Sequence, residues 1–158
     1  MPKVKPIPEG YAALTPTLTV KDTRKAIEFY QKAFGASQAH DLCEMPGGKI
    51  GHAEVMLGGC RVMISDEFPE MGCVAPSGKT RSNAFFLYVT DVDATFKKAI
   101  AAGAKSTMPV ADQFWGDRMG QIEDPFGHRW SIGTHIEDVT PEQMKERMDK
   151  QFAAGACK

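Results

Sequence analysis

A pattern of one strand, one helix and three further strands occurs twice along this 158-residue chain. In the first copy, the alternating segment 14–20 precedes a helical segment that closes with FGA at 34–36. In the second copy, the segment 84–89 precedes a helical segment that closes with AGA at 102–104. Apolar residues alternate in a half-buried strand and recur every three or four positions in an amphipathic helix. The repeat therefore predicts an α+β fold built from two tandem βαβββ modules.

Turn signals give each module a hairpin. The pair Gly58-Gly59 separates two strand-like runs in the first module, and both glycines tolerate the positive φ of a tight hairpin. The sequence DPFG at 124–127 separates the last two runs, with proline and glycine where a type I turn prefers them. Within a single domain of residues 1–158, the predicted parts are a first module at 12–66, a linker loop at 67–82, a second module at 83–135 and a C-terminal helix at 140–154.

Composition excludes several kinds of partner. The net charge is −1, and Lys and Arg are scattered along the chain, so we expect neither nucleic acid nor an anionic membrane as a partner. No apolar run approaches the roughly 20 residues of a membrane-spanning helix. The first residues do not follow the pattern of a signal peptide, and the four cysteines form no CxxC pair. We therefore expect a cytoplasmic protein with reduced thiols.

A capping box, TPEQ at 140–143, predicts the start of the C-terminal helix, with proline at the first helical position. Met144, Met148 and Phe152 then form a narrow apolar stripe. That stripe could dock on the core of its own chain or on a partner subunit, and the sequence leaves both readings open.

The tandem modules, together with the segments AIEFYQKAFGA, KIGHAEVMLGG, FWGDR and DPFGHRW, resemble the vicinal oxygen chelate superfamily and its PhnB-like branch. That superfamily contains glyoxalase I, extradiol dioxygenases, and fosfomycin- and bleomycin-resistance proteins. The resemblance runs from about Leu14 to Met144. It implies that each module curls its sheet into a trough around a cavity, with the helices on the convex side, and that the protein is a homodimer.

The resemblance also implies where a divalent metal ion would be held. Metal-dependent members use four inward-facing positions, which this chain fills with Thr15, Met56, Ala84 and Ser131. Divalent ions prefer imidazole, carboxylate or thiolate ligands, so we expect no metal cofactor at the usual site. Metal binding through a non-standard ligand set is the alternative. The glyoxalase and dioxygenase activities both use that metal, so we do not expect either activity at a site without it.

Alternation along the strands sorts the side chains by face. The residues expected to face the helices are Leu14, Leu18, Val20, Ala53, Val55, Leu57, Val62, Ile64, His128, Trp130 and Ile132. The residues expected to line the trough are Thr17, Met56, Arg61, Met63, Phe86, Tyr88, Arg129 and Ser131, and all of them except Arg61 are candidate ligand contacts.

Two groups of trough residues could carry chemistry. His52 and Glu54 lie two apart on one strand, where they could form a catalytic acid–base pair, an unusual ligand pair for a metal, or a hydrogen-bonded rim pair. In a loop at the mouth, Phe114, Trp115, Asp117 and Arg118 combine aromatic rings with a guanidinium, which suits a planar or anionic ligand. Alternatively, Arg118 forms a salt bridge with Asp117 or Glu123.

Three functions fit these features. The first is metal-independent binding of a small, aromatic or oxygenated molecule, as in the resistance proteins. The second is a lyase or isomerase that uses His52 and Glu54. The third is an interaction module without a ligand.

Overall fold

The computed structural model describes residues 6–78 and 83–153. Its elements, in chain order, are β1 (Thr17–Val20), α1 (Thr23–Phe34), β2 (Ser37–Glu44), β3 (Ile50–Leu57), β4 (Cys60–Asp66), the 3-10 helix η1 (Pro69–Met71), β5 (Ala84–Tyr88), α2 (Val92–Ala101), β6 (Lys105–Asp112), β7 (Asp117–Glu123), β8 (Arg129–His135) and α3 (Pro141–Ala153). Residues 79–82 of the predicted linker and residue 154 of the predicted C-terminal helix lie outside the described residues.

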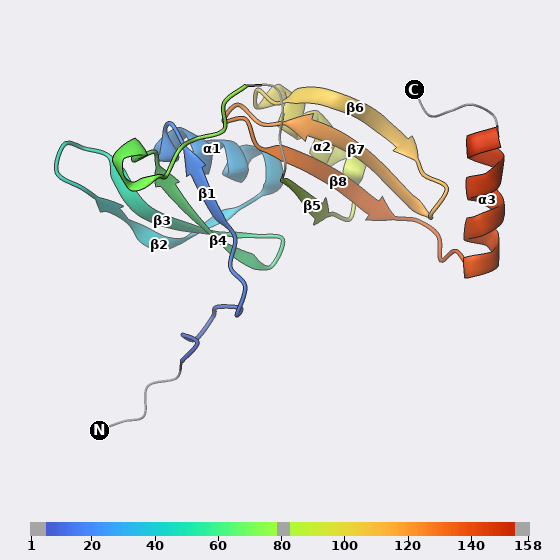
Figure 1. Cartoon of the computed structure of the whole chain (residues 1–158), viewed down its shortest axis with the longest axis horizontal. Coiled ribbons are helices and arrows are strands. Elements are labelled where there is room, and N and C mark those ends of the chain that lie inside the picture. Colours follow the sequence, from blue (N-terminus) through green and yellow to red (C-terminus); the bar gives the residue numbers. More distant parts are fainter. Residues whose placement is uncertain (1–5, 79–82, 154–158) are drawn as a thin grey trace.

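The two modules form two mixed sheets with the same topology. The strand orders are β1-β4-β3-β2 and β5-β8-β7-β6. In each sheet the first strand of the module runs parallel to the last strand, and the other pairs are antiparallel. The sheets lie in opposite halves of the molecule, with α1 and α2 against them (Figure 1). The duplicated α+β fold is therefore confirmed, and the sheets are not closed into a barrel.

The hairpin turns form as predicted. Gly58 and Gly59 have φ angles of 58° and 77°, which places both in the left-handed region that suits a tight hairpin. In the other hairpin, the backbone N–H of Gly127 donates to the carbonyl of Asp124 at 3.1 Å, which closes the DPFG turn.

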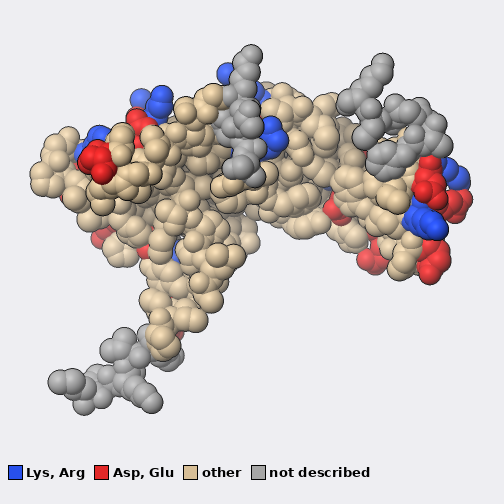
Figure 2. All heavy atoms as spheres, viewed as in Figure 1, with Lys and Arg blue, Asp and Glu red and all other residues tan. Residues whose placement is uncertain are grey.

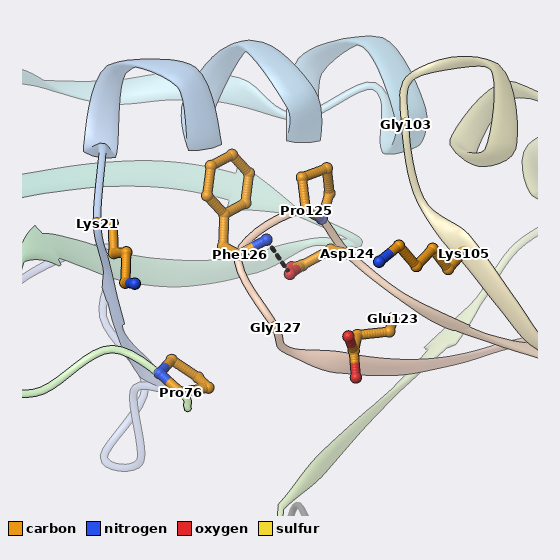
Figure 3. Close-up of a pocket in the computed structure, with 9 residues that line it drawn as sticks. All are labelled: Lys21, Pro76, Gly103, Lys105, Glu123, Asp124, Pro125, Phe126 and Gly127. Carbon is orange, nitrogen blue, oxygen red and sulfur yellow. Dashed lines mark hydrogen bonds between the residues drawn. The ribbon is translucent and has the colours of Figure 1, made fainter. Parts of the chain in front are cut away.

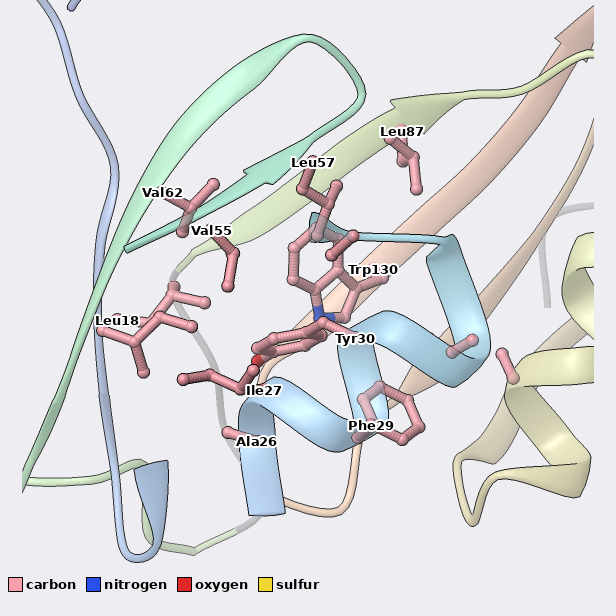
Figure 4. Packing of buried hydrophobic residues seen from close by; sticks show 14 of the residues in the cluster. Leu18, Ala26, Ile27, Phe29, Tyr30, Val55, Leu57, Val62, Leu87 and Trp130 are labelled. Atoms are coloured by element: carbon pink, nitrogen blue, oxygen red, sulfur yellow. The ribbon is translucent and has the colours of Figure 1, made fainter. Parts of the chain in front are cut away.

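Helix α1 forms the centre of the core (Figure 4). Its residues Ile27 and Tyr30 are buried against the first sheet, where Leu18 and Val55 are also buried. The Tyr30 ring also lies 5.6 Å from that of Trp130 on β8. One helix therefore packs against both modules and fixes their relative position.

One expectation about the first strand is wrong. Leu14 was expected to face the helices, but its side chain is 85% exposed, and β1 begins only at Thr17. Pro16 explains the difference because it has no N–H to donate to a sheet, although its carbonyl still accepts a hydrogen bond from Met63. The segment before Thr17 therefore leaves the sheet.

The C-terminal helix lies beyond the ends of β7 and β8, apart from both sheets (Figure 1). Its capping box is confirmed by reciprocal hydrogen bonds between Thr140 and Gln143. Arg147 holds the helix through two hydrogen bonds to Glu137, at 2.8 and 2.6 Å. Met148 remains 38% exposed, so the core of this chain does not cover the predicted stripe there.

Charged side chains gather around α3 at one end of the molecule, and the middle of the face shown in Figure 2 is largely uncharged. No stripe of Lys and Arg crosses that face. Among the described residues, no helix is both long enough and apolar enough to cross a membrane.

Candidate functional site

Strand alternation separates the two faces of each sheet as predicted. Leu18, Val20, Ala53, Val55, Leu57, Val62, Ile64, Trp130 and Ile132 are buried on the helix side. The opposite face of each sheet carries a buried carboxylate, Glu54 on β3 and Asp117 on β7, each held by three side chains. We call these two groups the Glu54 cluster and the Asp117 cluster.

The Glu54 cluster consists of Tyr11, His52, Glu54 and Arg61. The Tyr11 hydroxyl donates to Glu54 Oε1 at 2.5 Å, and His52 Nε2 lies 2.8 Å from the same oxygen. Arg61 donates to Oε2 from one terminal nitrogen, and its guanidinium lies over the Tyr11 ring, 4.4 Å from the ring centroid. Both oxygens of a carboxylate that is only 2% exposed are therefore satisfied.

These contacts keep Glu54 ionised. Burial raises its pKa, but the hydrogen bonds from Tyr11, His52 and Arg61 outweigh burial and hold the pKa at about 2. A carboxylate with so low a pKa is a weak base at neutral pH. Its chemical role is to orient the donors around it. Of its two basic partners, His52 is the more exposed, at 40% against 17% for Arg61.

The Asp117 cluster consists of Tyr88, Trp115, Asp117 and His135. Asp117 Oδ2 accepts hydrogen bonds from the Tyr88 hydroxyl at 2.9 Å and from the Trp115 indole nitrogen at 3.1 Å. Its Oδ1 lies 2.9 Å from His135 Nδ1, and His135 Nε2 lies 3.0 Å from Asp138. The cluster thus joins β5, β7, β8 and the segment that leads to α3.

Asp117 changes the acidity of its neighbours. Burial raises the pKa of Asp117, but the hydrogen bonds from His135, Tyr88 and Trp115 bring it below its usual value. The hydrogen bond to Asp117 and, to a smaller extent, the bond to Asp138 raise the pKa of His135. The hydrogen bond to Asp117 also raises the pKa of Tyr88. The group on this face is therefore a carboxylate bonded to an imidazole, a phenol and an indole.

Two aromatic rings form an exposed wall beside the Asp117 cluster. The rings of Phe86 and Tyr88 lie 4.6 Å apart and are 47% and 59% exposed. Phe86 lies over Gly133, where a Cβ would come within 2.9 Å of the ring. Next to this wall, a hollow of about 310 Å³ lies between the first hairpin and β5, with Trp130 among its lining residues.

Other predicted ligand contacts lie on the same faces. Thr17 donates weakly to the sulfur of Met63 at 3.8 Å, and Met56 is half-buried on β3. Arg129 is half-buried on β8, whereas Ser131 is buried and accepts a hydrogen bond from Gln121 at 3.3 Å. These five residues are placed where the alternation predicts them.

The structure divides the predicted loop FWGDR between two faces. Phe114 and Trp115 stand edge to face at 4.9 Å, and Asp117 forms the centre of its cluster. Arg118 lies on the helix side, where it binds both carboxylate oxygens of Asp93 at 2.7 and 2.8 Å and Asp112 at 2.8 Å. Arg118 therefore forms salt bridges, as one of the two alternatives predicted. Its partners are Asp93 and Asp112, whereas Asp117 or Glu123 was predicted.

Sequence reasoning missed two members of the clusters. Tyr11 precedes both modules and belongs to no periodic segment, so no pattern pointed to it. His135 could have been found, because it follows Ser131 and Gly133 on the same face at a spacing of two. His128 has the packing role expected of it, with Nε2 3.1 Å from the carbonyl of Thr19.

The donor set does not fit a divalent metal ion at the positions of the superfamily. Thr15, Met56, Ala84 and Ser131 supply no imidazole or carboxylate, and the Ser131 hydroxyl is already bonded to Gln121. His52 with Glu54 and His135 with Asp117 are sets of two on separate sheets. Within residues 6–78 and 83–153, no three His, Cys, Asp or Glu side chains converge as metal ligands would.

A further pocket lies away from both clusters, around the DPFG turn (Figure 3). It has a volume of about 410 Å³, and Lys21 and Lys105 are among its lining residues. Its carboxylate Asp124 is buried and already accepts hydrogen bonds from Phe126, His128, Trp130 and Tyr30. Asp124 thus stabilises the turn and is not available to a ligand.

Comparison with known proteins places these features in context. The model of the Glyoxalase/Bleomycin resistance protein/Dioxygenase superfamily matches residues 12–132. The uncharacterized protein Mb0911c of Mycobacterium bovis is 41% identical over 146 residues, which cover 88% of this chain and 93% of that protein. Among solved structures, TioX from Micromonospora sp. ML1 has a TM-score of 0.60 and 28% identity, over 79% of this chain and 99% of TioX. The PhnB protein from Bacillus cereus has a TM-score of 0.62 and 18% identity, over 78% and 99% of the two chains.

Proposed function

The chain belongs to the Glyoxalase/Bleomycin resistance protein/Dioxygenase superfamily, and on that premise we propose that it binds a small aromatic, oxygenated molecule on the trough face of its second sheet. Binding is proposed to require no metal ion. The resemblance seen in the sequence motifs is confirmed at the level of the superfamily, and a PhnB protein is among the structural neighbours.

The observation that carries this proposal is the exposed wall formed by Phe86 and Tyr88 next to the Asp117 cluster. When a planar ligand covers exposed aromatic rings of this kind, burial of apolar surface and offset stacking favour the bound state. The Tyr88 hydroxyl donates its proton to Asp117, so its oxygen can accept a hydrogen bond from a hydroxyl group of the ligand. An apolar wall with a few convergent polar groups is the usual composition of a small-molecule site.

Titration with 2-naphthol in the presence of EDTA tests the proposal, because this probe combines an aromatic surface with one hydroxyl. We expect saturable binding, and Phe86→Ala should weaken it by about tenfold through the loss of stacking and buried area. Met71→Ala is the matched control, since it removes an apolar side chain that is 74% exposed elsewhere, on η1. Equal affinity of the wild type and Phe86→Ala would exclude this wall as the binding surface.

A lyase or isomerase is the second candidate, and the hydrogen bond between His52 and Glu54 favours it. A buried carboxylate that bonds one imidazole nitrogen orients the ring for proton transfer at the other nitrogen. In this scheme His52 transfers the proton, and Glu54 positions it. If turnover of a substrate is unchanged in both His52→Ala and Glu54→Gln, these residues are not the catalytic pair.

We also propose that the protein forms a homodimer. The outer edges of β1 and β5 pair with no other strand of the described chain, and unpaired edges of this kind readily take up another chain. The exposed part of the α3 stripe adds apolar surface. Sedimentation at tens of micromolar that shows only the 17.3 kDa species would refute the dimer.

A cytoplasmic location is part of the same proposal. Cys43, Cys60 and Cys73 are free and exposed, and a reducing compartment keeps exposed thiols in that state. Fractionation of the source cells, with detection of the native protein, tests the location.

A further inference from the structure

The Glu54 cluster already holds a phenol, and that phenol comes from outside the βαβββ module. Tyr11 lies in the segment that precedes β1, and this segment projects away from the first sheet in Figure 1. Its ring enters the cluster so that the hydroxyl donates to Glu54 Oε1 at 2.5 Å and the face meets the guanidinium of Arg61 at 4.4 Å. Every other member of the cluster is on β3 or β4.

We propose that the Glu54 cluster is a second binding site, for a phenolic small molecule, and that Tyr11 occupies it as an internal stand-in that such a ligand displaces. This site is on the first sheet, whereas the site proposed above is on the second. The inference rests on the proposed function in one respect, that the protein binds aromatic molecules. Variants of Tyr11 test the inference, and Phe86→Ala tests the proposed function.

The chemistry of the cluster selects a phenol. A carboxylate only accepts hydrogen bonds, and a carboxylate buried as deeply as Glu54 is costly unless its oxygens are satisfied. His52 and Arg61 remain in place when Tyr11 leaves, but Oε1 then lacks its hydroxyl donor. The cation of Arg61 adds attraction for the face of an aromatic ring. An aliphatic alcohol supplies only the donor and a methoxybenzene supplies only the ring, whereas a phenol supplies both.

The attachment of Tyr11 permits exchange. The described hydrogen bonds from the segment 6–12 to the sheet are those of Tyr11 with Glu54 and of Arg61 Nε with the carbonyl of Gly10, at 3.2 Å. Gly10 has a φ of 79°, and a Cβ there would lie 3.2 Å from the Arg61 guanidinium. The segment is thus fitted closely to Arg61, yet none of its residues belongs to the buried core. Displacement replaces one phenol by another and leaves the core intact.

Tyr88 in the Asp117 cluster shows the contrast. It also donates a phenol hydroxyl to a buried carboxylate, but it is the last residue of β5 and pairs with Gly133 in the sheet. Tyr88 therefore cannot leave without breaking a strand. Of the two phenols, only Tyr11 is placed to be exchanged.

The test compares the binding of p-cresol and of 4-methylanisole, which lacks the hydroxyl proton, to three full-length proteins. In Tyr11→Ala the site is vacant, and we expect p-cresol to bind at least about tenfold more tightly than it binds the wild type, because it regains a hydrogen bond to a carboxylate. In Tyr11→Phe the ring still fills the site, so no gain is expected. The readouts are calorimetric titration and the NMR shifts of the His52 ring, which shares Oε1 with the phenol.

Several results would overturn the inference. These are no gain in Tyr11→Ala, an equal gain in Tyr11→Phe, equal binding of the two probes, or a gain that leaves the His52 resonances unchanged. A second measurement uses the same proteins: p-cresol should raise the melting temperature of Tyr11→Ala more than that of the wild type. Failure of the proposed function appears separately, as an unchanged affinity of Phe86→Ala for 2-naphthol.

Discussion

The hydroxyl of Tyr30 on α1 donates to Asp124 Oδ2 at 2.8 Å, although the two residues are 94 positions apart in the chain. Tyr30 belongs to the first module, and Asp124 lies in the last hairpin turn of the second. The indole of Trp130 donates to the same oxygen at 3.0 Å, and two backbone N–H groups of the turn donate to Oδ1. Burial and the neighbouring Asp124 both raise the pKa of Tyr30. One carboxylate therefore joins the turn and the second sheet to helix α1 of the first module.

Replacement of Asp124 should destabilise the whole fold. Asp124→Ala leaves four donors without their acceptor, and we expect the free energy of unfolding to fall by about 3 kcal/mol or more. Tyr30→Phe removes one bond to the same carboxylate and should cost about 2 kcal/mol. Urea unfolding measures both, with the exposed Asp41→Ala as the control. A loss in Asp124→Ala no greater than in Asp41→Ala would contradict this role.

Gly116 should be essential for the position of the Asp117 cluster. It has a φ of 95°, and a Cβ there would lie 2.0 Å from the carbonyl oxygen of Glu137. Gly59 has a similar φ of 77° but nothing within 4 Å of the same position. Gly59→Ala should therefore cost only about 1–2 kcal/mol for the backbone conformation, whereas Gly116→Ala should cost clearly more. Thermal unfolding compares the two, and equal losses would show that the contact with Glu137 does not matter.

His135 should make stability depend on pH at the neutral end. The hydrogen bonds to Asp117 and Asp138 raise its pKa in the folded protein above the usual 6.5. The charged imidazole therefore contributes stability that is complete below the unfolded pKa and is lost as the pH rises through the folded pKa. In NMR titration the pKa of His135 should lie above 6.5. As the pH rises from 6.5 through that pKa, His135→Ala should lose less stability than the wild type. A His135 pKa at or below 6.5 would contradict the bond to Asp117.

Glu54 should make stability depend on pH at the acid end, where stability is lost as the pH falls. Its pKa is lowered from 4.5 to about 2 in the folded protein, so its contribution is complete above 4.5 and is lost as the pH falls toward 2. Asp117, whose pKa is also lowered, adds to the same loss. Urea midpoints between neutral and acid pH should fall less steeply in Glu54→Gln than in the wild type. The same slope in both proteins would show that Glu54 is not held ionised by its partners.

Arg118 should be structural and should not affect ligand binding. Its salt bridges with Asp93 and Asp112 lie on the helix side of β7, on surfaces that are largely exposed. We expect Arg118→Ala to leave the affinity for 2-naphthol unchanged in the titration that tests Phe86. A weakened affinity with an unchanged fold would return Arg118 to the binding site predicted from the sequence.

The sequence predicts the fold better than it predicts the contacts within the site. Alternation placed Val55 and Ile64 on the buried face because one buried face imposes a period of two along a strand. The same rule failed at Leu14, where the proline at position 16 ends the pairing. Asp117 became a candidate because it belongs to the aromatic-rich segment FWGDR, and alternation had no part in that prediction.

The partners of the carboxylates could not be predicted in the same way. Tyr11 reaches Glu54 from a segment without periodicity, and its position depends on the guanidinium of Arg61, 50 residues later by sequence number. Arg118 was expected in a loop, but it is the second residue of β7, where its side chain lies on the face opposite to that of Asp117. Contacts between distant segments follow from three-dimensional packing, which local patterns do not contain.

The most direct test of metal-independent binding is mass spectrometry of the native protein, purified without a chelator, combined with metal analysis of the same sample. We predict an organic, aromatic adduct on the chain and a metal content well below one ion per chain. One tightly held divalent ion per chain, with loss of the adduct when the ion is removed, would contradict the account.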